Sequence, residues 1–166
     1  MFIASLIFAK RSKKIQDHYT RSTLLEQVMK VDISKSLKIT MAFNGKWTVS
    51  SFEGLKDVAD AFGVDESKRD PAKLQGATVE IKQDGDNLTF TATGGLGKTG
   101  SHSMTVGQPS EGELFGRAYS GTTAWEGDTI VSKGKSGLVL RRSIEGGNMV
   151  YTIEYGGKSG RIVFSK

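Results

Sequence analysis

The chain contains no cysteine, only two prolines and two histidines, and no apolar run long enough to cross a bilayer. Without cysteine it can form neither a disulfide framework nor a thiolate metal site, so nothing points to an oxidising compartment and a cytoplasmic location is expected. The histidines, His18 and His102, lie in different parts of the chain, and no cluster of His, Asp and Glu has the spacing of metal ligands. We therefore expect a protein without a metal or another cofactor.

Catalytic motifs are missing as well. The sequence has no Gly-x-Ser-x-Gly nucleophile elbow. Residues 92–99, Ala-Thr-Gly-Gly-Leu-Gly-Lys-Thr, resemble a phosphate-binding loop whose first glycine is replaced, but Gly100, Gly107 and Pro109 follow where a helix would have to begin. We expect a turn between strands there, no nucleotide site, and a protein that is not an enzyme.

Charge and glycine divide the chain at Met41. Residues 1–40 hold 8 Lys and Arg against 3 Asp and Glu, whereas residues 41–166 hold 15 of each, and all 21 glycines lie in this second part. Because the second part is neutral, nucleic-acid binding is not expected. We predict an extension over residues 1–40 and one globular domain over residues 41–166.

The extension is basic and begins with a short apolar run. Residues 2–9 are apolar and precede the basic cluster, the reverse of the order in a secretory signal. Thr23 and Glu26 have capping-box spacing, which predicts a short helix near residues 24–31. Two interpretations stay open: a membrane-surface or organelle-targeting segment, or a loose tail or upstream extension, with Met41 as the physiological start.

After Met41 the sequence predicts one strand, a helical cap and then only strands. An apolar stripe with helical spacing precedes a glycine stop and consists of Leu55, Val58, Ala59 and Phe62. A second helix across residues 67–75 is expected to be short, with Pro71 in its first turn. Two helices of this size can close one end of a barrel.

From Ala77 onward apolar and polar residues alternate, which is the pattern of strands. Residues 78–82 and 88–91 indicate a hairpin, and further glycine-rich turns recur at the spacing of a meander. Roughly ten strands fit. We predict a ten-stranded antiparallel up-and-down β-barrel of the clam type, capped by a short helix-turn-helix; closed barrels of this size hold one small ligand.

Residues 41–166 resemble the intracellular lipid-binding proteins, the family of fatty-acid-binding and cellular retinoid-binding proteins. The resemblance rests on Phe43, Gly45 and Trp47 at the first strand, Gly63-Val64 after the helix, the Asp84-Gly85-Asp86 turn and the hairpin from Arg142 to Tyr151. It implies a carrier that binds a long-chain fatty acid or a similar lipid non-covalently inside the barrel. We expect a monomer, with transient membrane contact through the helical cap as one means of delivery.

Arg142 is the main candidate for the head-group contact. Alternation places Arg142 on the same strand face as Leu140, and Arg141 on the opposite, less apolar face. A buried guanidinium keeps its proton and needs an anionic or strongly polar partner, which the carboxylate of a ligand would provide. The resemblance implies the same role, because the family keeps an internal arginine at this position. A slip of one residue would instead place Arg142 on the surface.

The last strand departs from the family pattern. Many fatty-acid carriers have an inward Arg-x-Tyr here, but counting from Met149 places Ile162 and Phe164 at those positions and turns Arg161 outward. The other register would turn Arg161 and Val163 inward and would still lack the tyrosine. Because the usual carboxylate grip is incomplete in either register, a carrier of retinoid or neutral lipid is an alternative.

Other candidate contacts line the interior or its mouth. Tyr151 and Ile153 share one strand face below Arg142, and the resemblance places Leu96 at an entry loop opposite Leu55, with Arg117 as a second basic group at this portal. The candidate ligand-binding residues are Arg142, Tyr151, Ile153, Phe164, Ile162, Leu140, Leu55, Leu96 and Arg117. Each can also be ordinary core or surface, so a ligand-free interaction or structural barrel, with a filled interior, stays open as an alternative of another class.

Overall fold

A computed structural model describes residues 42–68, 70–93, 100–114 and 117–166 of the chain. The predicted extension over residues 1–40, with its short helix, lies outside the described residues. The same holds for the glycine-rich segment 94–99, which includes Leu96.

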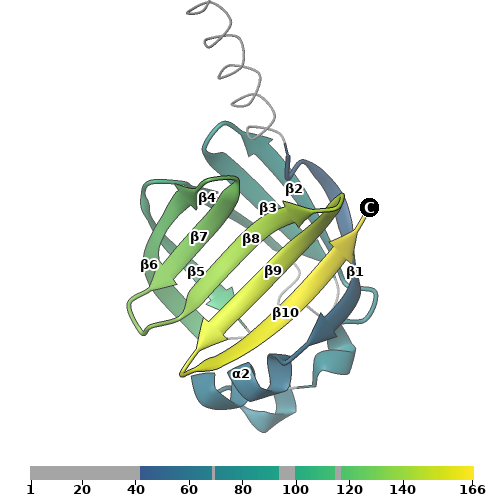
Figure 1. The fold of residues 1–166 in the computed structure, drawn as a ribbon, viewed down its shortest axis with the longest axis vertical. Helices are drawn as coiled ribbons and strands as arrows, with labels where there is room; N and C mark the ends of the chain where they lie inside the picture. The colour runs from purple at the N-terminus through teal and green to yellow at the C-terminus, as the bar shows by residue number, and fades with distance from the viewer. Residues whose placement is uncertain (1–41, 69, 94–99, 115–116) are drawn as a thin grey trace, which may run out of the picture. The chain divides into compact units, whose positions relative to one another are not determined.

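Ten strands, drawn as arrows in Figure 1, form one antiparallel sheet. They are β1 (Gly45–Glu53), β2 (Thr78–Asp84), β3 (Asn87–Thr93), β4 (Gly100–Thr105), β5 (Pro109–Leu114), β6 (Arg117–Glu126), β7 (Thr129–Gly134), β8 (Val139–Glu145), β9 (Asn148–Tyr155) and β10 (Lys158–Ser165). The hydrogen-bonded order β4-β3-β2-β1-β10-β9-β8-β7-β6-β5 joins the first strand to the last, so the sheet curls into a nearly closed barrel. Within the described residues no ladder joins β4 to β5. The predicted ten-stranded up-and-down barrel is confirmed.

Strand alternation separates interior from exterior side chains, and β10 shows this clearly. Ile162 and Phe164 are 2% and 0% exposed and face the interior. Arg161, immediately before Ile162, faces outward and donates from Nη2 to the Glu145 carboxylate at 2.8 Å. The observed register is therefore the one with Ile162 and Phe164 inward, and the register with Arg161 inward is excluded.

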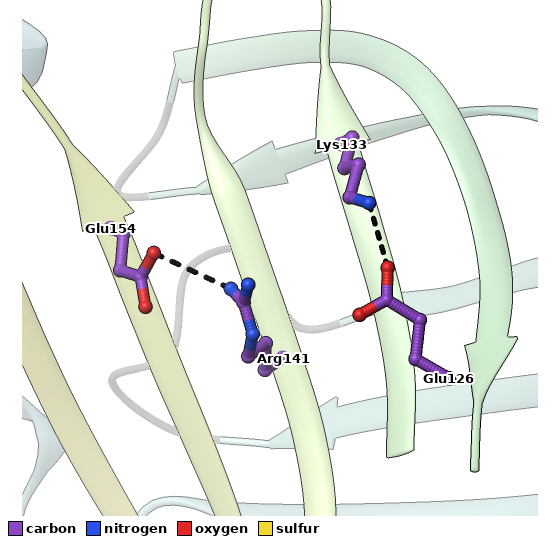
Figure 2. Close-up of polar contacts among 4 residues, drawn as sticks. All are labelled: Glu126, Lys133, Arg141 and Glu154. Carbon is purple, nitrogen blue, oxygen red and sulfur yellow. Dashed lines mark hydrogen bonds and ion pairs between the residues drawn. The ribbon is translucent and has the colours of Figure 1, made fainter.

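Charged side chains on the outer face pair across neighbouring strands (Figure 2). Lys133 of β7 lies 2.7 Å from Glu126 of β6, and Arg141 of β8 lies 3.4 Å from Glu154 of β9, both measured from nitrogen to oxygen. Because all four side chains are substantially exposed, solvent screens these pairs and each contributes little to stability. Arg141 is thus an outward counterpart of its neighbour Arg142.

The helix α2 (Leu55–Phe62) lies across one end of the barrel, against β9 and β10 (Figure 1). The whole predicted apolar stripe is buried, and the Phe62 ring meets the Tyr155 ring edge-on, with 4.9 Å between centroids. Gly54 and Gly63 flank the helix with φ of 65° and 73°, a conformation that residues with a Cβ adopt reluctantly. The helix is therefore fixed by its apolar face and by two glycine ends.

The second helical segment consists of two 3₁₀ turns rather than a regular α-helix. These are η1 (Glu66–Lys68) and η2 (Pro71–Leu74). The Asp70 carboxylate accepts a hydrogen bond from the Ala72 N–H at 3.0 Å and so caps η2, whose proline stands in the first turn as predicted. The segment offers little apolar surface, with Leu74 as its buried side chain, which limits it to short turns.

The start of β1 fills the end of the barrel away from α2. Phe43 and Trp47 are each 1% exposed. Trp47 Nε1 donates to the Phe43 carbonyl at 2.8 Å, and the Phe43 N–H donates to Gln83 Oε1 at 3.3 Å. Because these buried polar groups are paired, large side chains close this end without leaving unsatisfied donors.

The packing of the helical cap on β10 predicts an unequal response to alanine at two glycines with similar φ. A Cβ at Gly54 would collide with the Ser159 carbonyl oxygen, whereas a Cβ at Gly127 would meet nothing within 4 Å. Gly127→Ala should lower the free energy of unfolding by about 1 kcal/mol through backbone strain alone. Gly54→Ala should lower the free energy of unfolding by at least twice that amount, as measured by denaturant titration followed by circular dichroism. Equal losses would contradict the close approach of the cap to the sheet.

Candidate ligand-binding site in the barrel interior

Arg142 on β8 faces the interior together with Leu140. Arg142 is 6% exposed and Leu140 is 3% exposed. In the sheet Arg142 lies opposite Tyr151 of β9 on one side and Ile130 of β7 on the other. Arg142 therefore faces the interior, as the alternation of side chains along the strand predicts, and does not lie on the surface.

The contacts of Arg142 are polar or aromatic, and none is with a carboxylate of the described residues. Its Nη1 donates to Ser132 Oγ at 2.9 Å. The guanidinium carbon lies 5.2 Å from the centroid of the Tyr151 ring and 5.6 Å from that of Phe90, so two ring faces offset part of its charge. Its buried Nε has no hydrogen-bond partner among the described residues. A buried cation with a free donor is a strong site for an anionic oxygen.

A row of hydroxyl groups extends from Arg142 across three strands, and we call it the hydroxyl ladder: Ser132 of β7, Thr123 of β6 and Ser110 of β5. Ser132 Oγ lies 2.9 Å from Thr123 Oγ1, which lies 3.0 Å from Ser110 Oγ. Thr123 and Ser132 are 2% and 3% exposed, so these hydroxyls are satisfied by one another and by Arg142. Sequence reasoning missed the ladder, because both faces of β5 are polar or small and alternation there does not show which face turns inward.

Two titratable groups near Arg142 are held neutral around physiological pH. Burial and the positive charge of Arg142 lower the pKa of His102 on β4, whose ring stacks on Phe90 at 6.4 Å between centroids. Desolvation raises the pKa of the Tyr151 phenol, and the charge of Arg142 acts in the opposite direction without cancelling that rise. Arg142 is therefore the charged member of this group of three side chains.

The opposite wall of the interior is apolar. Ile153 and Phe164 are both 0% exposed, and the Tyr151 ring tilts against Phe164 at 4.8 Å between centroids. Several side chains that face inward, among them Phe90, Tyr119 and Tyr151, nevertheless keep accessible surface.

The structure separates the remaining candidates from the Arg142 group. Leu55 is 3% exposed and packs on β10, where a Cβ at Gly160 would come within 2.9 Å of it. Arg117 lies at the C-terminal end of α2: its Nη1 donates to the Phe62 and Gly63 carbonyls, the second at 3.1 Å, and its guanidinium carbon is 5.0 Å from the Phe62 ring centroid. A cation at a helix C-terminus is stabilising, so these contacts give Arg117 a structural reason to be there.

Across residues 42–166, leaving aside the undescribed positions, no group of three or more His, Asp or Glu side chains could hold a metal ion. Among the described helices, none has the length and apolar character that a membrane span requires.

The chain is similar to individual fatty acid-binding proteins. No family model matches the chain. The intestinal fatty acid-binding protein of Bos taurus is 31% identical over 140 residues, covering 76% of this chain and 99% of that protein. The liver fatty acid binding protein 1-A of Danio rerio is 36% identical over 75 residues, covering 45% of this chain and 58% of that protein.

Solved structures with the same fold include fatty acid carriers. The REP1-NXSQ fatty acid transporter superimposes with a TM-score of 0.66 at 26% identity, covering 74% of this chain and 94% of that one. A Schistosoma mansoni fatty acid binding protein in complex with arachidonic acid gives a TM-score of 0.67, covering 76% of this chain and 97% of that one. Its identity of 20% supports the fold alone.

The proximity of His102 to Arg142 predicts a measurable coupling. In a His18→Gln background, which leaves one imidazole, NMR titration should give His102 a pKa below its ordinary value. Arg142→Met should raise that pKa, because a nearby positive charge disfavours the imidazolium. Arg141→Met, which removes an outward arginine from the same strand, should leave the pKa unchanged. Equal shifts in both variants would refute a specific interaction with Arg142.

Proposed function

This chain belongs to the intracellular lipid-binding protein family, and on that premise we propose that this lipid carrier takes a long-chain fatty acid, held non-covalently in the barrel interior. The single observation that carries the proposal is the buried guanidinium of Arg142, which no carboxylate of the described residues neutralises. We propose that the carboxylate of the ligand binds there. Tyr151, Ile153, Ile162 and Phe164 would contact the chain of the ligand.

The free donors of Arg142 suit a carboxylate. Guanidinium has five N–H donors; the described residues engage it through the Ser132 hydroxyl, which accepts from Nη1, and through the Tyr151 phenol, and they leave Nε without a partner. A carboxylate can accept from two guanidinium nitrogens at once, and such bonds are about twice as strong as neutral ones. The ligand would thus supply the partner that Nε lacks and would offset the cost of burying the charge.

The energetics fit a carrier that must also release its ligand. Burying about a dozen methylenes at roughly 0.8 kcal/mol each gives about 10 kcal/mol. Loss of translational freedom and ordering of the chain oppose this by several kcal/mol, roughly. The balance corresponds to dissociation constants from about micromolar to high nanomolar.

A carrier of retinoid or neutral lipid is the second candidate, and one observation favours it. The inward positions of β10 hold Ile162 and Phe164, so this strand adds neither an arginine nor a tyrosine to the head-group site. A single cation tolerates more kinds of polar head than a three-residue grip. Against a ligand-free barrel stands the accessible surface on inward side chains such as Phe90 and Tyr151.

We also propose the setting in which the carrier works. Residues 1–40 would form an extension and residues 41–166 the lipid-binding domain. The domain would act as a cytoplasmic monomer without catalytic activity, and it would exchange ligand through transient membrane contact of the helical cap. Neither a cofactor nor nucleic acid has a role in this proposal.

The head-group role of Arg142 is tested with an acid and an alcohol of equal chain length. Calorimetric titration of the delipidated full chain should show saturable one-site binding of oleate. Arg142→Gln should weaken oleate at least about tenfold, because a charged hydrogen bond contributes about 1.5–3 kcal/mol. Oleyl alcohol should lose less than about threefold.

Arg141→Gln is the matched control, since Arg141 carries the same charge on the outer face. It should leave both affinities unchanged. Equal weakening of acid and alcohol by Arg142→Gln would remove Arg142 from the head-group role. Absence of binding by either ligand would contradict the fatty-acid proposal as a whole.

A further inference from the structure

The hydroxyl ladder has a direction, and Arg142 sets it. Guanidinium has donors and no acceptor, so Nη1 must donate to Ser132 Oγ. Each hydroxyl has one hydrogen to donate. The Ser132 hydrogen is then directed to Thr123 Oγ1, and the Thr123 hydrogen to Ser110 Oγ. The ladder therefore ends at Ser110, and the hydroxyl hydrogen of Ser110 has no acceptor among the described residues.

The reverse direction is unfavourable. If Ser110 donated to Thr123 and Thr123 to Ser132, the Ser132 hydrogen would have no acceptor among the hydrogen bonds of the described residues. Ser132 is 3% exposed, so that hydrogen could not reach bulk water, and a buried unsatisfied donor is costly. All the buried hydroxyl hydrogens have an acceptor when the one hydrogen without an acceptor belongs to Ser110. Ser110 is the member of the hydroxyl ladder that is only partly buried.

Ser110 is placed where a ligand can meet it. It lies on β5, the strand at the end of the hydrogen-bonded order, and no ladder among the described residues joins β5 to β4. Its partner across the β5–β6 pairing is Gly121, which has no side chain to cover the hydroxyl. Ser110 Oγ accepts from Thr123 and keeps one lone pair, so the group can both donate to and accept from a ligand hydroxyl.

We propose that the interior is suited to a hydroxylated fatty acid, with its carboxylate at Arg142 and a hydroxyl group in the middle of its chain at Ser110. This inference rests on the proposed function, because the carboxylate fixes where the rest of the ligand lies. Three hydrogen bonds of about 3 Å each place Ser110 Oγ at most about 9 Å from the guanidinium. An extended chain advances about 3.5 Å for every three bonds, so the carbon that carries the hydroxyl lies at most about eight bonds from the carboxylate carbon, near carbon 9 of the chain.

The test compares three acids of equal length on the delipidated full chain by calorimetry: octadecanoate, 9-hydroxyoctadecanoate and 17-hydroxyoctadecanoate. The mid-chain hydroxy acid should bind about fivefold tighter than octadecanoate, the gain from one well-placed hydrogen bond. The 17-hydroxy acid carries its hydroxyl at the far end, where Ser110 cannot reach it, and should show no such gain.

Ser110→Ala should abolish the fivefold preference while changing octadecanoate affinity less than about twofold. Ser103→Ala is the matched control, because Ser103, at an exposed position of β4, pairs with the hydroxyl of the half-buried Thr89 of β3 at 3.0 Å. It should keep the preference. Retained octadecanoate binding also shows that the Ser110 variant is folded.

Two outcomes overturn the inference: equal affinity of the wild-type chain for octadecanoate and its 9-hydroxy derivative, or a preference that survives Ser110→Ala. Equal affinity would mean that solvent satisfies Ser110 as well as a ligand does. Failure of the underlying proposal looks different, since octadecanoate itself would then not bind or would be indifferent to Arg142→Gln.

Discussion

The pairing of β1 with β10 is the constraint on which the rest of the domain depends. It joins the first strand of the chain to the last in the middle of the described sheet, so that strands β1 to β4 and β5 to β10 form one continuous wall with an interior and an exterior face. The register shifts between Val49 and Ser51, which bends β1 as it passes from β2 towards the helical cap. Because side chains alternate strictly, this closure decides that Arg142 faces inward and Arg141 outward. Neighbours in sequence thereby acquire opposite chemical roles.

Placing Arg142 inside has consequences for everything around it. Its positive charge favours the neutral form of His102 and draws hydrogen-bonded hydroxyls into a row that would be unfavourable in an apolar core. Outside, Arg141 meets Glu154 in solvent and influences little. The same side chain is therefore a minor surface feature or the centre of an electrostatic site, depending on one residue of register.

The sequence was sufficient for features that rest on strong periodicity. The stripe of α2, the ten strands and the inward face of β8 to β10 could all be predicted, because apolar residues there alternate or recur at helical spacing. The hydroxyl ladder could not, since β5 reads Pro-Ser-Glu-Gly-Glu-Leu and both of its faces are polar or small. Hydrophobic patterning has no information about which of two polar faces turns inward. Likewise, the resemblance predicted Arg117 near the portal, but the sequence could not show that its guanidinium meets the carbonyl groups at the C-terminal end of α2.

Among the residues that the structure describes, no ladder pairs the edges of β4 and β5, and this bears on how the domain behaves among copies of itself. Exposed strand edges are templates for the addition of a strand from another molecule. Here β5 begins with Pro109, which has no N–H to offer, and carries the exposed acids Glu111 and Glu113. A second copy aligned on this edge would set carboxylates against carboxylates. The gap in the barrel wall is thus protected against aggregation by the composition of the strand that borders it.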